Sequence, residues 1–178
     1  METQLSTPRR RGRPPKPRES LVETRDLLLR AGLEVLTEKG FSATGIDEIL
    51  HRVSVPKGSF YHYFESKEAF GAALIAQYAH FYARKIDRYL SDKTLSPLTR
   101  LRAFVTGAQA GMARHDFRRG CLIGNLGQEM GSLPESFRRQ LQAVFDDWQA
   151  RFARCLMAAK EAGELSRQAD CEQLAAFF

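Results

Sequence analysis

Long apolar runs are missing from this chain of 178 residues, since nowhere do about 18 apolar residues follow one another as a membrane-spanning helix requires. No apolar stretch follows the basic cluster near the N-terminus, so no secretory signal is predicted. Cysteine is scarce, and the number and spacing of Cys121, Cys155 and Cys171 suit neither a disulfide framework nor a paired zinc site. These absences predict a cytoplasmic protein without a membrane partner.

Catalytic signatures are missing as well. The sequence holds no Ser/His/Asp order, no H-E-x-x-H, no P-loop and no dinucleotide-binding glycine pattern. His51, His80 and His115 lack the spacing of metal ligands. We therefore expect no enzymatic activity, no metal and no cofactor.

The formal net charge of +6 is concentrated at one end of the chain. Residues 1–18 carry six basic side chains against one acidic side chain, together with four prolines, whereas the rest of the chain is nearly balanced. Proline opposes regular structure, so a disordered basic arm is predicted over residues 1–18. Such an arm is typical of nucleic-acid binding, although some basic tails only increase solubility.

Helical periodicity dominates the remaining sequence, whose apolar content of 43 % over the whole chain suffices for a packed core. No segment alternates in the manner of a strand, so the fold class is predicted to be all-α. The expected helices cover about residues 19–39 (ended by Gly40), 46–53, 60–64, 67–90, 97–114, 121–130, 135–162 and 170 onwards. Because the sequence stops within the last of these, we expect its C-terminal helices to be incomplete.

Three short helices with a tight turn over residues 54–59 have the layout of a helix-turn-helix, whose third helix reads the DNA major groove. Phe60 and Phe64 lie four residues apart and can anchor the third helix. A helix packed for stability alone is the alternative, but four aromatic side chains within residues 60–64 cannot all be buried on so short a helix. The side chains available to phosphates or base edges are those of Lys57, Ser59, Tyr61, His62 and Tyr63.

The stretches FSATGI (41–46) and VSVPKGSFYHYFESKE (53–68) resemble the DNA-binding region of TetR-type transcriptional regulators. The resemblance implies an all-helical homodimer, usually a repressor of operator DNA. Its three-helix DNA-binding domain would cover residues 19–68, and its effector-binding and dimerisation domain residues 69–178. By the same resemblance, phosphates would be bound by Thr44, Tyr63 and Lys67, and the groove would be faced by Pro56, Lys57, Ser59, Tyr61 and His62. Lys67 also stands at a helix start, where backbone amides favour anions.

The arm carries a second DNA-binding pattern. Arg11-Gly12-Arg13-Pro14 resembles the core of an AT-hook, whose extended arginines lie in the narrow minor groove of A·T-rich DNA. We expect Arg11 and Arg13 to add affinity rather than sequence choice. An architectural DNA binder that no small molecule releases is an alternative, but it would not need the long helical region that follows.

The stretch RRGCLIGN (118–125) places Cys121 after two guanidinium groups at a helix start, where the reactive thiolate is favoured. It resembles a TetR subgroup that includes regulators of electrophile and aldehyde stress. The resemblance implies a small unsaturated acid such as acrylate, or a related electrophile, as the effector. Cys121 is then an inert buried side chain, a pocket wall or a reactive sensor, and these alternatives stay open. Asn125 and Glu129 are further pocket candidates, and the alternative for both is a position on the surface. Trp148 is another pocket candidate, and its alternative is a position in the core.

Overall fold

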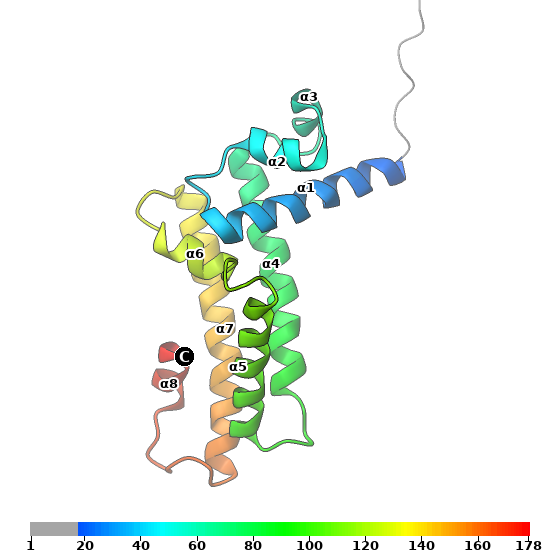
Figure 1. The fold of residues 1–178 in the computed structure, drawn as a ribbon. Coiled ribbons are helices and arrows are strands. Elements are labelled where there is room, and N and C mark those ends of the chain that lie inside the picture. The colour runs from blue at the N-terminus through cyan, green and yellow to red at the C-terminus, as the bar shows by residue number, and fades with distance from the viewer. Residues whose placement is uncertain (1–17) are drawn as a thin grey trace, which may run out of the picture.

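The computed structural model describes residues 18–178, which fold into eight helices joined by turns, without a strand in this range (Figure 1). The predicted all-α class is confirmed. The helices are α1 (Arg18–Lys39), α2 (Ile46–Val53), α3 (Lys57–Phe60), α4 (Lys67–Leu90), α5 (Pro97–Ala113), α6 (Leu122–Gln128), α7 (Glu135–Glu161) and α8 (Cys171–Phe177). Among these helices, none has both the length and the apolar character needed to cross a membrane. The arm residues Arg11 and Arg13 lie outside the described range.

Several helix ends follow from local capping chemistry. Gly40 ends α1 with a φ of +82°, a conformation that glycine adopts without steric cost. At the start of α4 the hydroxyl oxygen of Ser66 accepts the backbone N–H of Ala69 at 2.9 Å. At the start of α8 the Asp170 carboxylate accepts the backbone N–H of Gln173 at 3.0 Å. These ends agree with the signals in the sequence.

The third helix differs from its prediction. We expected it over residues 60–64, but α3 is Lys57–Phe60 and begins directly after Pro56. The chain then continues as a tight turn, in which the backbone N–H of Tyr63 donates to the carbonyl oxygen of Phe60 at 2.9 Å. The rings of Phe60 and Phe64 both pack against Phe70 of α4, with centroids 5.5 and 4.8 Å away. Because the rings of Phe60 and Phe64 both contact α4, the chain between them forms a turn, and α3 ends earlier than predicted.

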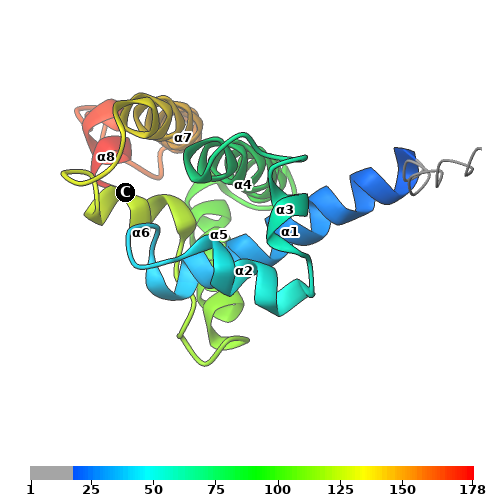
Figure 2. The same ribbon diagram turned by 90° about the horizontal axis from the view of Figure 1, so that it is seen from above.

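The long helices α4, α5 and α7 form a bundle, and α1, α2 and α3 lie together at one end of it (Figure 1). Helix α8 packs along α7, and α6 lies between α1 and the bundle, as the view from above shows (Figure 2). One apolar core continues from the first three helices through α6 into α4 and α7, while a second occupies the far end of the bundle. The helix-turn-helix is therefore joined to the bundle by packing as well as by α4.

Close packing holds the loop between α1 and α2 against the bundle. The ring of Phe41 meets Phe137 of α7 edge to face, with centroids 4.9 Å apart. Gly71 of α4 lies beneath both rings, and a Cβ atom there would stand 2.4 Å from the Phe137 ring and 2.7 Å from the Phe41 ring. Only a glycine lets the two rings approach α4 this closely.

Candidate nucleic-acid interface and effector cavity

The surface around α3 is open to solvent. Phe60 is fully buried and Phe64 nearly so, which confirms them as anchors, whereas Tyr61 is 52 % exposed. Of the side chains expected to face the groove, Pro56, Lys57, Tyr61 and His62 are exposed and Ser59 is half-buried; Tyr63, expected at a phosphate, is also half-buried. This reading surface is therefore accessible to another molecule.

Lys57 is not a free cation on this surface. Its ammonium donates to the carboxylate of Asp47, in the first turn of α2, at 2.9 Å, and both side chains are mainly exposed. The hydrogen bond and the charge of Asp47 raise the pKa of Lys57. Sequence reasoning missed Asp47 because the helix dipole explains an acidic residue in a first helical turn.

Two residues expected to bind phosphate are engaged inside the protein. Thr44 is 1 % exposed, and its hydroxyl donates to the carbonyl oxygen of Gly40 at 2.6 Å. This burial removes Thr44 from the surface that DNA can reach, so the expectation for Thr44 is corrected. The ammonium of Lys67 donates to the carbonyl oxygen of Phe41 at 3.0 Å and lies 4.4 Å from the centre of the Phe41 ring. Burial lowers the pKa of Lys67, and the charge of Glu129 partly opposes this.

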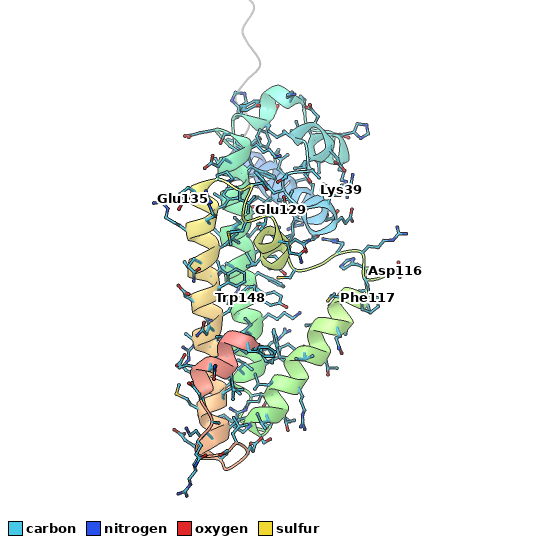
Figure 3. All side chains as sticks on the ribbon, turned by 90° about the vertical axis from the view of Figure 1, so that its left-hand side faces the viewer. Lys39, Asp116, Phe117, Glu129, Glu135 and Trp148 are labelled. Atoms are coloured by element: carbon cyan, nitrogen blue, oxygen red, sulfur yellow. The ribbon has the colours of Figure 1, made fainter. Side chains whose placement is uncertain are left out.

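The helix α6 connects the bundle to the helix-turn-helix through polar contacts at both ends. At its start, the backbone N–H of Gly120 and the side-chain amide of Asn125 both donate to the carbonyl oxygen of Thr37 at 3.0 Å. At its end, the Glu129 carboxylate accepts the backbone N–H groups of Phe41 and Ser42 at 2.8 and 2.7 Å. Figure 3 shows Glu129 at the junction of α6 with the end of α1. Asn125 and Glu129 thus bind the DNA-binding region instead of lining a pocket, which corrects their predicted placement.

A cavity of about 210 Å³ opens between α4, α5 and the loop that precedes α6. Its walls are Leu33, Thr37, Tyr78, Phe81, Tyr82, Lys85, Ala108, Gly111, Met112, His115, Arg119, Gly120 and Cys121. Cys121 lines this cavity, as expected if it is a pocket wall, which was one of three interpretations of this residue. Trp148 does not, because its ring packs 4.9 Å behind that of Tyr82 and contacts both apolar cores. The contacts of Trp148 are those of the core position, which was one of its two interpretations.

The thiol of Cys121 lies beside two tyrosines at the inner wall of the cavity. Burial, and next the neighbouring Cys121, raise the pKa of Tyr78. The same two causes raise the pKa of Tyr82 to about 12. Both phenols therefore stay protonated and can donate hydrogen bonds at neutral pH.

Two cations lie beside Gly111 on the cavity wall: Lys85, which lines the cavity, and Arg114, which follows α5. Arg114 Nη2 and Lys85 Nζ both lie within 4 Å of the position that a Cβ atom on Gly111 would take. Burial, and then the charges of Arg114 and Arg88, lower the pKa of Lys85. Within residues 18–178 neither Lys85 nor Arg114 has an ion-pair partner, and no Asp or Glu is among the cavity walls. The sequence held a signal for Lys85, which follows the inward-facing Leu74, Tyr78 and Tyr82 at helical spacing. No group of His, Cys, Asp or Glu in the described range has the geometry of a metal site.

Comparison with known proteins places this architecture in one family. The model described as "Bacterial regulatory proteins, tetR family" matches residues 28–74, and "Tetracyclin repressor-like, C-terminal domain" matches residues 97–178. Transcriptional regulator AcuR of Cereibacter sphaeroides is 54 % identical over 170 residues, which are 95 % of this chain and 77 % of AcuR.

Solved structures agree with this result. The crystal structure of regulatory protein TetR from Rhodobacter sphaeroides is 55 % identical, with a TM-score of 0.84 over 86 % of this chain and 81 % of that one. The reduced form of NemR from E. coli is 30 % identical, with a TM-score of 0.79 over 87 % of this chain and 80 % of that one. The open surface around α3 lies within the first of the two family matches, and the second covers most of the bundle. This chain belongs to the TetR family of DNA-binding transcriptional regulators and is not an enzyme.

Proposed function

We propose that this regulator is a homodimeric repressor that a small effector releases from its operator. In this proposal residues 19–68 form the DNA-binding domain, residues 69–178 bind the effector and dimerise, and Arg11 and Arg13 of the arm add affinity in the minor groove. The protein would act in the bacterial cytoplasm, where operator DNA is found. The observation that carries the proposal is that α6 starts beside the cavity at Cys121 and ends at Glu129, on the loop before α2.

Release follows from this connection. An effector that displaces the start of α6 also displaces Asn125 and Glu129, and with them the end of α1 and the loop before α2. A dimer reads half-sites about one helical turn apart, so a shift of a few ångströms removes contacts on both sides. Full reversal from bound to free requires the effector to prefer the released state by about 5.5 kcal/mol.

The cavity favours a small acid as the effector. An apolar cavity of about 150 Å³ holds benzene, so a ligand here has few heavy atoms. Lys85 and Arg114 offer two cations to a carboxylate, while Phe81, Ala108 and Met112 suit a short hydrocarbon chain. Acrylate combines these properties. Its double bond can also react with the thiol of Cys121, which lines the same cavity.

A DNA-release assay tests this function. Duplexes selected by the protein from a random pool are labelled, and fluorescence anisotropy follows release as acrylate, other short acids, aldehydes and enones are added. Light scattering on the same sample gives the oligomeric state. We expect a dimer that acrylate releases. If none of these compounds releases the DNA, the protein is an architectural binder and the proposal is wrong.

Thiol sensing is a second candidate, favoured by the half-buried position of Cys121 on the cavity wall. An electrophile would bond to the sulfur at its β-carbon, and the α-carbon would take up the proton. Cys155 and Cys171 are buried, which makes the reaction selective. An alkylating maleimide should then release DNA from the wild type and leave Cys121→Ser bound. If acrylate releases DNA from both the wild type and Cys121→Ser, Cys121 lines the pocket without reacting.

A further inference from the structure

An acidic side chain stands on the reading surface, where DNA phosphates would repel it. The carboxylate of Asp47 is exposed, and its hydrogen bond to Lys57 crosses the turn between α2 and α3. An exposed ion pair of this kind contributes only about 0–1 kcal/mol to stability. The favourable position of Asp47 at the start of α2 adds only about 0.3–1 kcal/mol. Both contributions to folding are small, so a role in DNA reading can also account for an acidic residue here.

Two glycines flank this ion pair, and neither is required by packing within the described residues. A Cβ atom on Gly45, which precedes α2, or on Gly58, which follows Lys57, would meet no heavy atom within 4 Å. Neither residue has a positive φ. Glycine permits another molecule to approach the backbone closely. The backbone on either side of Asp47 and Lys57 is uncovered, so a double helix can come close to the pair.

The pair also matches one base pair chemically. In the major groove, guanine presents the acceptors N7 and O6, and its partner cytosine presents the amino donor N4. Guanine O6 and cytosine N4 are hydrogen-bonded to each other, about 2.9 Å apart. The ammonium of Lys57 and the carboxylate of Asp47 are 2.9 Å apart and present a donor and an acceptor in the complementary order. A T·A pair presents an acceptor and an amino donor in the same order, but it carries the thymine methyl group where guanine has N7, so donation from Lys57 to N7 is what selects G·C.

We propose that Asp47 and Lys57 act together as a specificity-determining pair that reads one G·C base pair in each half-site. Lys57 donates to guanine O6 and N7, and Asp47 accepts from cytosine N4. The carboxylate also holds the ammonium away from phosphates, so that Lys57 reads a base instead of strengthening non-specific binding. This inference rests on DNA reading by the surface around α3 and does not depend on the effector.

Selection from a duplex pool with about 20 randomised base pairs, two helical turns, tests the pair. The full chain is compared with Asp47→Asn, Asp47→Ala, Lys57→Met and the double variant Asp47→Ala/Lys57→Met. Glu23→Gln is the control, because it removes one negative charge from an exposed position on α1. Affinities are then measured on the selected duplex and on each single base-pair change, at one fixed salt concentration.

We expect the wild type and Glu23→Gln to require a G·C pair at one position of each half-site. Asp47→Ala should lose about fivefold to hundredfold discrimination at that position only, and both Asp47→Ala and Asp47→Asn should bind random duplexes more tightly. The double variant should lose no more there than either single variant, since the two side chains read the same base pair. Thermal melting confirms that each variant is folded.

Two results would overturn the inference. In one, all variants select the same motif and Asp47→Asn gains the same factor on every duplex, so that Asp47 only reduces the overall attraction. In the other, discrimination is lost at a position occupied by A·T. Both results leave the regulator's own DNA binding intact, whereas a wild type that selects no motif would reject the proposed function together with the inference.

Discussion

At the scale of single residues, the side chain with the most demanding position is Glu129. Burial alone would raise the pKa of this carboxyl, but the hydrogen bonds from Ser42 and Phe41 and the charge of Lys67 outweigh it and lower the pKa. Gly40 makes room for the carboxylate, since a Cβ atom there would stand 2.1 Å from Glu129 Oε1. The contact therefore depends on a glycine and two backbone amides from the loop before α2 and on a cation from the start of α4.

Replacing this carboxylate measures what it contributes. Glu129→Gln keeps the shape but leaves one acceptor oxygen for two backbone N–H groups and turns an amide donor towards one of them. We expect the free energy of unfolding to fall by about 1–2 kcal/mol, as measured by urea denaturation. Glu161→Gln, an exposed change on α7, should stay within about 0.5 kcal/mol of the wild type. Equal stability of the two variants would show that Glu129 does not hold the loop.

Because the pKa of Glu129 is lowered in the folded protein, its contribution to stability depends on pH. Its folded-state pKa lies below the ordinary value, so the stabilisation is complete above the unfolded pKa and is lost as the pH falls through the folded one. The difference in melting temperature between the wild type and Glu129→Gln should be largest above the ordinary pKa of a glutamate and should shrink as the pH falls below it. A difference that grows on acidification would contradict this assignment.

At the scale of helices and loops, two glycines in helix interiors should respond oppositely to alanine. Alanine normally stabilises a helix relative to glycine by about 0.5–1 kcal/mol. At Gly111 of α5 the nearest atoms to a new Cβ are 3.7 and 3.8 Å away, which is ordinary contact, so Gly111→Ala should gain about that amount. At Gly71 the same atom would enter the rings of Phe137 and Phe41, so overpacking should outweigh the gain.

Thermal or urea unfolding of the two variants checks this contrast. Gly71→Ala is expected to lose about 1–3 kcal/mol, since both rings must leave their positions. The loss should be accompanied by weaker DNA binding, because Phe41 precedes α2 by only a few residues. Stabilisation by both substitutions would mean that the loop between α1 and α2 does not pack against α4 and α7 as described.

The elements also show what the sequence could and could not predict. Capping residues and periodicity determine α1, α4, α5 and α7 locally, so their positions were predicted closely. Helix α3 was misplaced because its end depends on the packing of Phe60 and Phe64 against Phe70, far along the chain. Periodicity correctly placed Asn125 and Glu129 on one face of α6, but it cannot tell whether that face meets a cavity or the end of α1.

The residues of the cavity were hard to predict for a different reason. Cys121 stood out by its chemistry, whereas Tyr78, Lys85 and Gly111 become neighbours only when α4 and α5 pack side by side. Asp47 was overlooked for the same reason, because its relation to Lys57 exists only after the turn between α2 and α3 brings them together. Residues with local causes are visible in a sequence, and residues defined by contacts between elements are not.

At the scale of the whole molecule, the proposed release mechanism couples DNA binding and effector binding through α6. Asp116 and Phe117 follow α5 in the chain and both have positive φ values. Figure 3 shows them beyond the end of α5 that is nearer to the DNA-binding region. The loop from there to Cys121 leads directly into the contacts of α6 with Thr37. Linkage requires that an effector which weakens DNA binding is itself bound less tightly in the presence of DNA, by the same factor.

Asn125→Ala tests this connection without touching the cavity. The variant removes one of two donors to the carbonyl oxygen of Thr37 and leaves the backbone N–H of Gly120 in place, so the fold should persist. We expect acrylate to bind the free variant as it binds the wild type, measured by calorimetry. The coupling factor between acrylate and DNA should fall from the typical range of about 5–150 towards 1, measured as acrylate affinity with and without the selected duplex. Gln128→Ala, exposed on the same helix, should keep the wild-type factor. If Asn125→Ala keeps it too, the signal does not pass through this contact of α6, and the connection between cavity and operator runs through the cavity walls on α1 or α4 instead.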